Sequence, residues 1–194
     1  MSTGAKTIFH GTDLNGIGAI CVHPSKKWFA VAEKGVSPNT YIYEWPSLRL
    51  YRVLRKGTEM FYAHCEFSHT GTLLATLGGA PDYTLTVWDW VKQAVILKSK
   101  AFGQEVYRVS FSPYTDNILF TCGLTHIKFW KMAETFTGLK LQGEIAKYGK
   151  LELSSVSAFR ELQDGKVVSG TDTGTLIVWE GEVIKSHLML DVEK

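Results

Sequence analysis

The feature that most constrains this chain is a tryptophan that returns at nearly constant spacing. Four short segments of the 194-residue sequence each end in a tryptophan followed by a polar or turn-prone residue: Trp45, Trp88, Trp130 and Trp179. The steps between them are 43, 42 and 49 residues. A period of this length marks a repeated supersecondary unit that cannot bury its hydrophobic face alone, so neighbouring copies must stack on one another.

The segments around each tryptophan recur in the same order. Two apolar strands precede each tryptophan strand and a more polar strand follows it; the first apolar strands lie near residues 19–22, 64–67, 109–111 and 156–159. Short apolar runs bounded by Gly, Pro, Asp and Ser at regular spacing indicate strands rather than helices. Four strands in each period, with a terminal tryptophan, are typical of a WD-repeat blade in a β-propeller.

The predicted fold is therefore an all-β, WD40-type β-propeller with about four blades. The WD40 repeat region takes in residues 1–194, with blades at approximately 16–56, 60–100, 105–147 and 154–189 and an extra opening strand at 6–9. We expect stacking to bury the four tryptophans between sheets, together with four residues at equivalent positions of the first strands: Val22, Phe67, Phe111 and Phe159. The alternative is one ordinary sandwich in which the tryptophan spacing is a coincidence.

Four blades leave open whether the ring closes. Propellers carry about 4–8 blades, so the chain could form a small closed ring or an arc of a larger one. The extra opening strand normally completes the last blade of a ring, and no partner strand for it is visible near the end of the sequence. We therefore expect an incomplete arc of a larger propeller, with two uncovered blade faces through which copies of the chain could self-associate.

Composition and charge argue against several classes of function. Aromatic residues make up 12% of the chain, which is too much for a disordered segment. The formal net charge of +2 gives no electrostatic reason to expect nucleic acid or an anionic membrane as a partner. No apolar run approaches the roughly 18–20 residues that a membrane-spanning helix needs. The 3 cysteines are too few for a disulfide framework and fit a reducing compartment such as the cytoplasm.

Motifs that suggest catalysis or metal binding are each incomplete. Asp172-Thr173-Gly174 matches the triplet of aspartic proteases, but that chemistry needs a second carboxylate to share the proton, and Asp and Gly also favour a tight turn. His64, Cys65 and His69 could suggest zinc, although alternation along a strand puts His64 and Cys65 on opposite faces. We therefore predict no enzyme activity and no catalytic, cofactor-binding or metal-binding residues.

A basic stretch lies on the predicted outer strand of the first blade: Arg49, Arg52, Arg55 and Lys56. A partner with acidic tails, such as tubulin, could bind these side chains. Charges on an exposed edge strand also block aggregation between strands, so the same residues could serve only to protect the edge.

Six segments of the chain resemble one known family. They are Gly18–Gly35, Tyr41–Arg55, Pro81–Trp90, Lys100–Pro113, His126–Gly143 and Asp164–Lys185. The most specific part is TFTGLKLQG within the fifth segment, which we expect in a loop at the blade periphery. Together these segments are similar to the first WD-repeat propeller of the cilia- and flagella-associated protein 44 family, over about residues 16–185.

The resemblance implies a non-catalytic scaffold in the cytoskeleton of the ciliary or flagellar axoneme. The family is associated with the tether that links an inner-arm dynein to the doublet microtubule. It acts with a paralogous WD-repeat protein and supports ciliary and sperm motility, so these are the partners implied. The alternative is a generic cytosolic WD40 adaptor in signalling or degradation complexes.

The chain departs from the generic pattern of WD repeats. Only Trp88-Asp89 is a true Trp-Asp pair, and no Gly-His dipeptide occurs in the sequence. The buried hydrogen-bond network usual in such repeats, which joins Asp, His, Ser or Thr, and Trp, is therefore not present as a full set. Asp82, six residues before Trp88, is the best candidate for its acidic member.

Overall fold

The computed structural model describes residue 8 and residues 16–189, and within them every regular element is a β-strand. The strands form four antiparallel sheets of four strands each, one sheet for each expected repeat. The all-β prediction is confirmed. The strand bounds are β1 Ile17–Val22, β2 Trp28–Glu33, β3 Thr40–Glu44, β4 Leu50–Leu54, β5 Tyr62–Phe67, β6 Leu74–Gly78, β7 Thr84–Asp89, β8 Ala94–Lys100, β9 Val106–Phe111, β10 Ile118–Gly123, β11 His126–Thr135, β12 Gly138–Ile145, β13 Val156–Glu161, β14 Val167–Thr171, β15 Thr175–Glu180 and β16 Val183–Met189.

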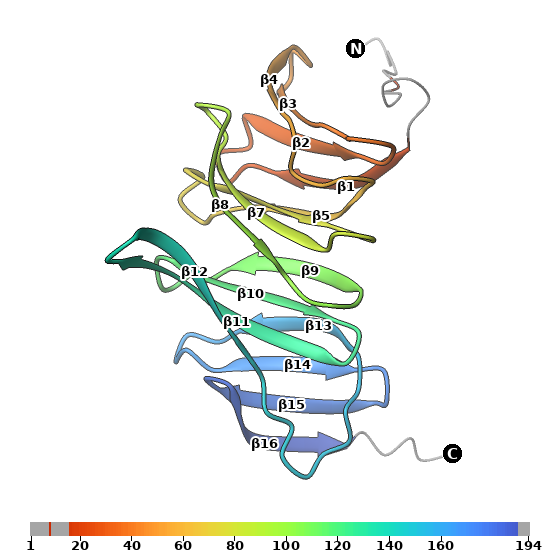
Figure 1. The fold of residues 1–194 in the computed structure, drawn as a ribbon, viewed down its shortest axis with the longest axis vertical. Helices are drawn as coiled ribbons and strands as arrows, with labels where there is room; N and C mark the ends of the chain where they lie inside the picture. The colour runs from red at the N-terminus through yellow and green to blue at the C-terminus, as the bar shows by residue number, and fades with distance from the viewer. Residues whose placement is uncertain (1–7, 9–15, 190–194) are drawn as a thin grey trace, which may run out of the picture.

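Each sheet is a meander whose strands lie side by side in chain order. The four sheets stack in a row from the N-terminal to the C-terminal end of the chain (Figure 1). The first strands of neighbouring sheets lie together, β1 against β5 and β5 against β9. The first and last sheets stand at opposite ends of the row, so each has one face without a neighbouring sheet among the described residues (Figure 1). The stack is the open arc that the repeat count predicts.

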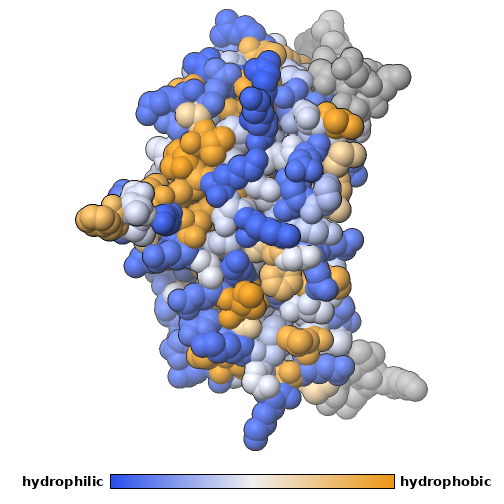
Figure 2. All heavy atoms as spheres, viewed as in Figure 1, coloured by the Kyte–Doolittle hydropathy of each residue, from blue (hydrophilic) through white to orange (hydrophobic). Residues whose placement is uncertain are grey.

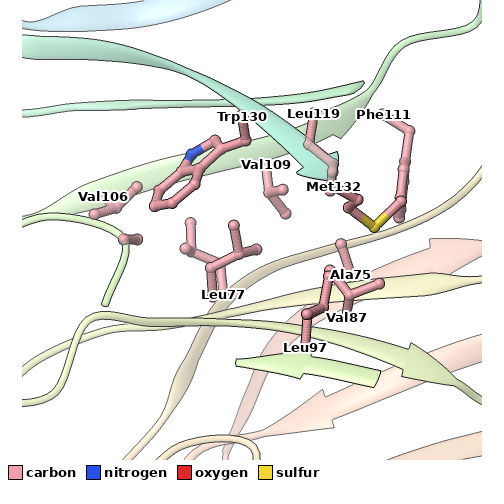
Figure 3. Packing of buried hydrophobic residues seen from close by; sticks show 12 residues of the cluster. Ala75, Leu77, Val87, Leu97, Val106, Val109, Phe111, Leu119, Trp130 and Met132 are labelled. Carbon is pink, nitrogen blue, oxygen red and sulfur yellow. The ribbon is translucent and has the colours of Figure 1, made fainter. Parts of the chain in front are cut away.

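Three seams hold the stack together, and each seam is filled by its own hydrophobic cluster. The first seam lies between the sheets β1–β4 and β5–β8, the second between β5–β8 and β9–β12, and the third between β9–β12 and β13–β16. In the second seam, Trp130 and Val109 of one sheet point toward Leu77 and Val87 of the other (Figure 3). Burial of each such side chain stabilises the stack by about 1.5–3 kcal/mol.

In each of the last three sheets, the tryptophan of the third strand is fixed in the same way. Its ring enters the seam with the preceding sheet, where it is 0–2% exposed. Its indole nitrogen donates to a hydroxyl on the second strand of its own sheet: Trp88 to Thr76 at 2.8 Å, Trp130 to Thr121 at 2.9 Å and Trp179 to Ser169 at 2.8 Å.

The expectation that Trp45 belongs to this series is wrong. The register of β2 and β3 gives Tyr43 the place that Trp88 has in the pairing of β6 with β7. Trp45 is therefore the counterpart of Trp90, and it lies on the uncovered face of the first sheet, where it is 58% exposed. Sequence spacing alone does not separate the two positions, because both carry an aromatic residue in each of the first two repeats.

Two of the four expected first-strand positions also need correction. Val22 is 61% exposed, because no described sheet precedes the face on which it lies. Phe159 is buried, but it is not the counterpart of Phe67 and Phe111. Each of those residues is the last of its strand and opposes the first residues of the next strand, and in the fourth sheet that place belongs to Glu161.

Two further expectations concern segments outside the stack. Of the opening strand expected at residues 6–9, only Ile8 lies within the described part of the chain. The segment Thr135–Gly143, expected as a loop, instead forms the end of β11 and most of β12. These two strands make a long hairpin that projects from the stack (Figure 1). The hairpin and the longer connection at 146–155 account for the 49-residue step between tryptophans.

We predict that Trp88→Ala lowers the free energy of unfolding by about 3–5 kcal/mol, because it empties part of the first seam and leaves the Thr76 hydroxyl without its donor. Trp45→Ala is the matched control, since it removes the same ring from an exposed site, and we expect a change of less than about 1 kcal/mol. Urea unfolding followed by circular dichroism measures both. Equal losses in the two variants would contradict the register described above.

Candidate functional site

Both ends of the sheet stack present an apolar face. On the first sheet, Ile20, Val22 and Trp45 are 61%, 61% and 58% exposed. On the last sheet, Val168 and Val178 pair across β14 and β15 and are half-buried. Soluble monomers rarely expose large contiguous apolar patches, so both faces favour contact with another sheet.

A third apolar surface runs along the outer strands. Val91, Val95 and Ile96, in and next to β8, are 43%, 45% and 37% exposed, and Phe136 at the tip of the β11–β12 hairpin is fully exposed. β8 lies against β12, so the surface crosses from one sheet to the next. Figure 2 shows hydrophobic residues gathered along this side of the molecule, as far as the projecting hairpin.

A row of polar side chains connects the first strands across the second seam. Glu66 on β5 accepts a hydrogen bond from the Ser110 hydroxyl at 2.7 Å and another from the Phe111 amide at 3.1 Å, both on β9. Beside it, His64 Nδ1 accepts a hydrogen bond from the Val109 amide at 3.4 Å. These bonds fix the position of one sheet against the next.

Burial changes the pKa of both titratable groups in this row. Burial lowers the pKa of His64 to about 4, and the positive charge of Arg108 contributes in the same direction. Burial raises the pKa of Glu66, while the hydrogen bonds from Ser110 and Phe111 partly offset this effect. His64 is therefore neutral in the folded chain at neutral pH, as its role as a hydrogen-bond acceptor requires.

Asp82 ties the loop between β6 and β7 to the loop before β5. Its carboxylate oxygens accept hydrogen bonds from the Thr58 and Thr84 hydroxyls, each at 2.7 Å. The Trp88 indole bonds to Thr76 instead, so Asp82 and Trp88 belong to two separate hydrogen-bonded groups. Sequence reasoning missed Thr58 and Thr76, because threonine is common in strands and nothing in its spacing distinguishes these two.

The residues of the motifs that suggested catalysis or a metal site take part in turns and in the packing of the seams. Asp172 lies in the turn after β14, where its carboxylate accepts a hydrogen bond from the Ser155 amide at 3.1 Å. Cys65 is buried in the first seam, whereas His64 bonds across the second. No group of three or more His, Cys, Asp or Glu side chains within residues 16–189 is placed to hold a metal ion. The same described part contains no helix long and apolar enough to cross a membrane.

The basic stretch, of which only Arg52 lies on β4, forms contacts within the chain. The Arg49 guanidinium pairs with the Glu44 carboxylate at 3.2 Å. The Arg52 guanidinium lies 4.0 Å from the centre of the Tyr51 ring and donates to the Val91 carbonyl at 2.8 Å. This bond connects β4 of the first sheet to the turn before β8 of the second. Arg52 therefore has a structural use that does not need an acidic partner.

Comparison with known proteins identifies the fold and the family. Residues 10–192 match the family described as "Echinoderm microtubule-associated protein first beta-propeller". A β-propeller domain of Cps50 (Swd1) from Myceliophteria thermophila superposes with a TM-score of 0.78 at 14% sequence identity, over 95% of this chain and 57% of that chain. The prediction of a WD40-type propeller, present as an incomplete arc, is confirmed.

Several curated relatives from different organisms carry the same name. The chain is 54% identical over 173 residues to "Cilia- and flagella-associated protein 44" of Mus musculus, which covers 89% of this chain and 9% of that protein. It is 50% identical over 192 residues to the protein of that name from Chlamydomonas reinhardtii, which covers 95% of this chain and 11% of that protein. The resemblance found in the sequence is confirmed, and the chain spans about a tenth of the length of these relatives.

The lowered pKa of His64 predicts a pH dependence of stability. Because the pKa is near 6.5 in the unfolded chain and about 4 in the folded one, protonation favours unfolding. The contribution of His64 is present above pH 6.5 and is lost as the pH falls toward 4. Relative to a His64→Gln variant, we expect the free energy of unfolding to fall by roughly 2–3 kcal/mol over this range. Urea unfolding at several pH values measures the difference, and parallel curves for the two proteins would contradict it.

The uncovered end faces predict that the 194-residue chain self-associates in solution. Val22→Lys places a charge on the first sheet's free face, and we expect it to shift the population toward monomer because a charge cannot be buried cheaply in an apolar contact. Phe136→Lys changes a more exposed apolar residue away from both end faces and is the control. Light scattering after size exclusion measures the mass, and a wild-type monomer at every concentration would contradict the prediction.

Proposed function

Because this chain belongs to the Echinoderm microtubule-associated protein first β-propeller family, we propose that it is a rigid, non-catalytic segment of a scaffold in cilia and flagella. The observation that carries the proposal is the identity of 50–54% across most of the chain to two relatives named for cilia and flagella, from organisms as different as Mus musculus and Chlamydomonas reinhardtii. The location that follows is the cytoskeleton of the axoneme, within the cytoplasm.

The mechanism we propose is presentation of surfaces on a stiff frame. Hydrogen bonds hold the strands of each sheet, and three packed seams hold the sheets together, so the surfaces have fixed positions relative to one another. Protein partners would contact the two apolar end faces or the outer surface around β8 and the β11–β12 hairpin. Scaffolds place binding residues at such edges because loops and outer strands tolerate change more than the core.

In the axoneme, we propose that the parent scaffold contributes to the tether that links an inner-arm dynein to the doublet microtubule. A paralogous WD-repeat protein would be its direct neighbour, and ciliary and sperm motility would depend on the assembly. These roles come from the resemblance to the family. The open ends of the arc support the idea of a segment that works only when other protein covers its faces.

A chimera tests the proposal. This chain would replace the matching segment of the Chlamydomonas reinhardtii relative, in cells that lack the native protein. We expect the chimera to co-purify with axonemes, to restore swimming and to label an inner-arm dynein in proximity labelling. The same chimera with Trp88→Ala should lose all three, because the first seam is weakened.

Two controls make the outcome decisive. The unmodified relative, expressed at the same level, sets the upper limit, and the relative without the segment sets the lower limit. A stable chimera that stays in the soluble fraction would reject the ciliary role and favour the alternative of a cytosolic WD40 adaptor.

A further inference from the structure

Because the sheets repeat, the residues at one equivalent position can be compared in all three seams. At this position, the second, third and fourth sheets each place two residues in the seam with the sheet before. They are the last residue of the first strand and the residue two places after the core tryptophan. In the first seam these are Phe67 and Trp90, whose ring centroids lie 5.0 and 5.4 Å from that of His23 and 5.6 Å from each other. In the second seam they are Phe111 and Met132, and both are buried. Large side chains occupy this place in both seams, although a cavity of about 390 Å³ lies next to Phe111 and Met132 in the second seam.

In the third seam, the same two positions hold Glu161 and Gly181. Glu161 ends β13 and opposes Val167, the first residue of β14, and Gly181 follows Trp179 by two places. A carboxylate thus replaces phenylalanine, and a hydrogen replaces the side chain of Trp or Met. A cavity of about 390 Å³ lies here between the third and fourth sheets.

The walls of this third-seam cavity combine aromatic rings with negative charge. Phe120 and Phe129 line it from the third sheet, edge to face with ring centroids 5.7 Å apart. Glu144 and Glu182 line it together with Glu161, whereas Lys131 is its one basic lining residue. The cavity therefore favours a positively charged occupant that also has apolar surface.

Glu161 itself is buried, and one of its carboxylate oxygens is unpaired. It is 7% exposed, and its Oε2 atom has no hydrogen-bond partner. A buried carboxylate is costly unless a cation or hydrogen-bond donor pairs with it. Two lysines pair with other carboxylates: Lys147 with Glu182 of the cavity wall at 3.4 Å, and Lys185 with Glu180 at 3.0 Å.

We propose that the third-seam cavity binds an arginine side chain presented by a partner protein. The guanidinium would donate to the Glu161 carboxylate, and its planar fork suits such a pair. Its flat face would stack on the ring of Phe129, and its methylene stem would fill the apolar part of the cavity. A lysine ammonium is a compact point charge and offers neither the fork nor the flat face. The proposal does not depend on the ciliary assignment.

Nuclear magnetic resonance of the complete 194-residue chain tests it, with the peptide acetyl-Gly-Arg-Gly-amide as the probe. We expect saturable shifts of the Glu161 and Gly181 amides, and much weaker binding of the peptides that carry citrulline or lysine in place of arginine. Glu161→Gln should weaken the arginine peptide about tenfold, since it replaces a charged hydrogen-bond partner with a neutral one. Glu134→Gln changes an exposed glutamate outside the cavity and should leave binding unchanged.

A second variant separates binding from folding. Glu161→Phe restores the residue that the first two seams use. It removes the carboxylate and places a ring in the cavity, so it should abolish binding while the resonances of the first seam stay in place. Absence of saturable shifts in the wild-type chain would overturn the proposal. So would equal binding of the citrulline or lysine peptide, or full binding by Glu161→Phe.

Discussion

The stacking of the sheets depends on the hydrogen bond between an indole nitrogen and a hydroxyl on the neighbouring strand. A tryptophan ring is large enough to fill a seam, but its N–H cannot be buried without a partner except at a cost comparable to a lost hydrogen bond. The hydroxyls that satisfy it are themselves 0–1% exposed: Thr76, Thr121 and Ser169. Because the bond stays within one sheet, each of the last three blades supplies both the ring that fills the preceding seam and the hydroxyl that accepts its N–H.

The first blade lacks both the indole donor and the hydroxyl acceptor of this hydrogen bond. Its counterpart of tryptophan is Tyr43, and its counterpart of Thr76 is Val31, which opposes Ile20 as Thr76 opposes Cys65. The donor and the acceptor are absent together, so no polar group of this pair is left unsatisfied. The first sheet's outer face is thus built differently from the three faces that enter seams, which agrees with its exposure at the end of the stack.

The sequence predicted the number of sheets, the order of strands and the open arc, because these follow from hydrophobic pattern and turn spacing. It did not predict which residue occupies which repeat position. Two aromatic residues lie on the same side of β3, so the period alone led to Trp45, and only the pairing with β2 identifies Tyr43. Likewise, Phe159 lies two residues before Glu161 on the same side of β13. Its hydrophobicity led to the prediction that it is the counterpart of Phe67, whereas the pairing with β14 gives that position to Glu161.

The third-seam cavity could not be predicted from the sequence for a related reason. Its acidic lining depends on two replacements, Glu161 for phenylalanine and Gly181 for Trp or Met, in segments 20 residues apart, and neither change is a recognisable motif. The cavity can persist because its walls are strands that pair within two separate sheets. To close it, one sheet would have to move against the other and break the packing of Trp179 in the same seam. Because the two sheets already hold the cavity open, its residues lose little conformational freedom when a side chain enters. This low entropic cost favours binding even where the contact is small.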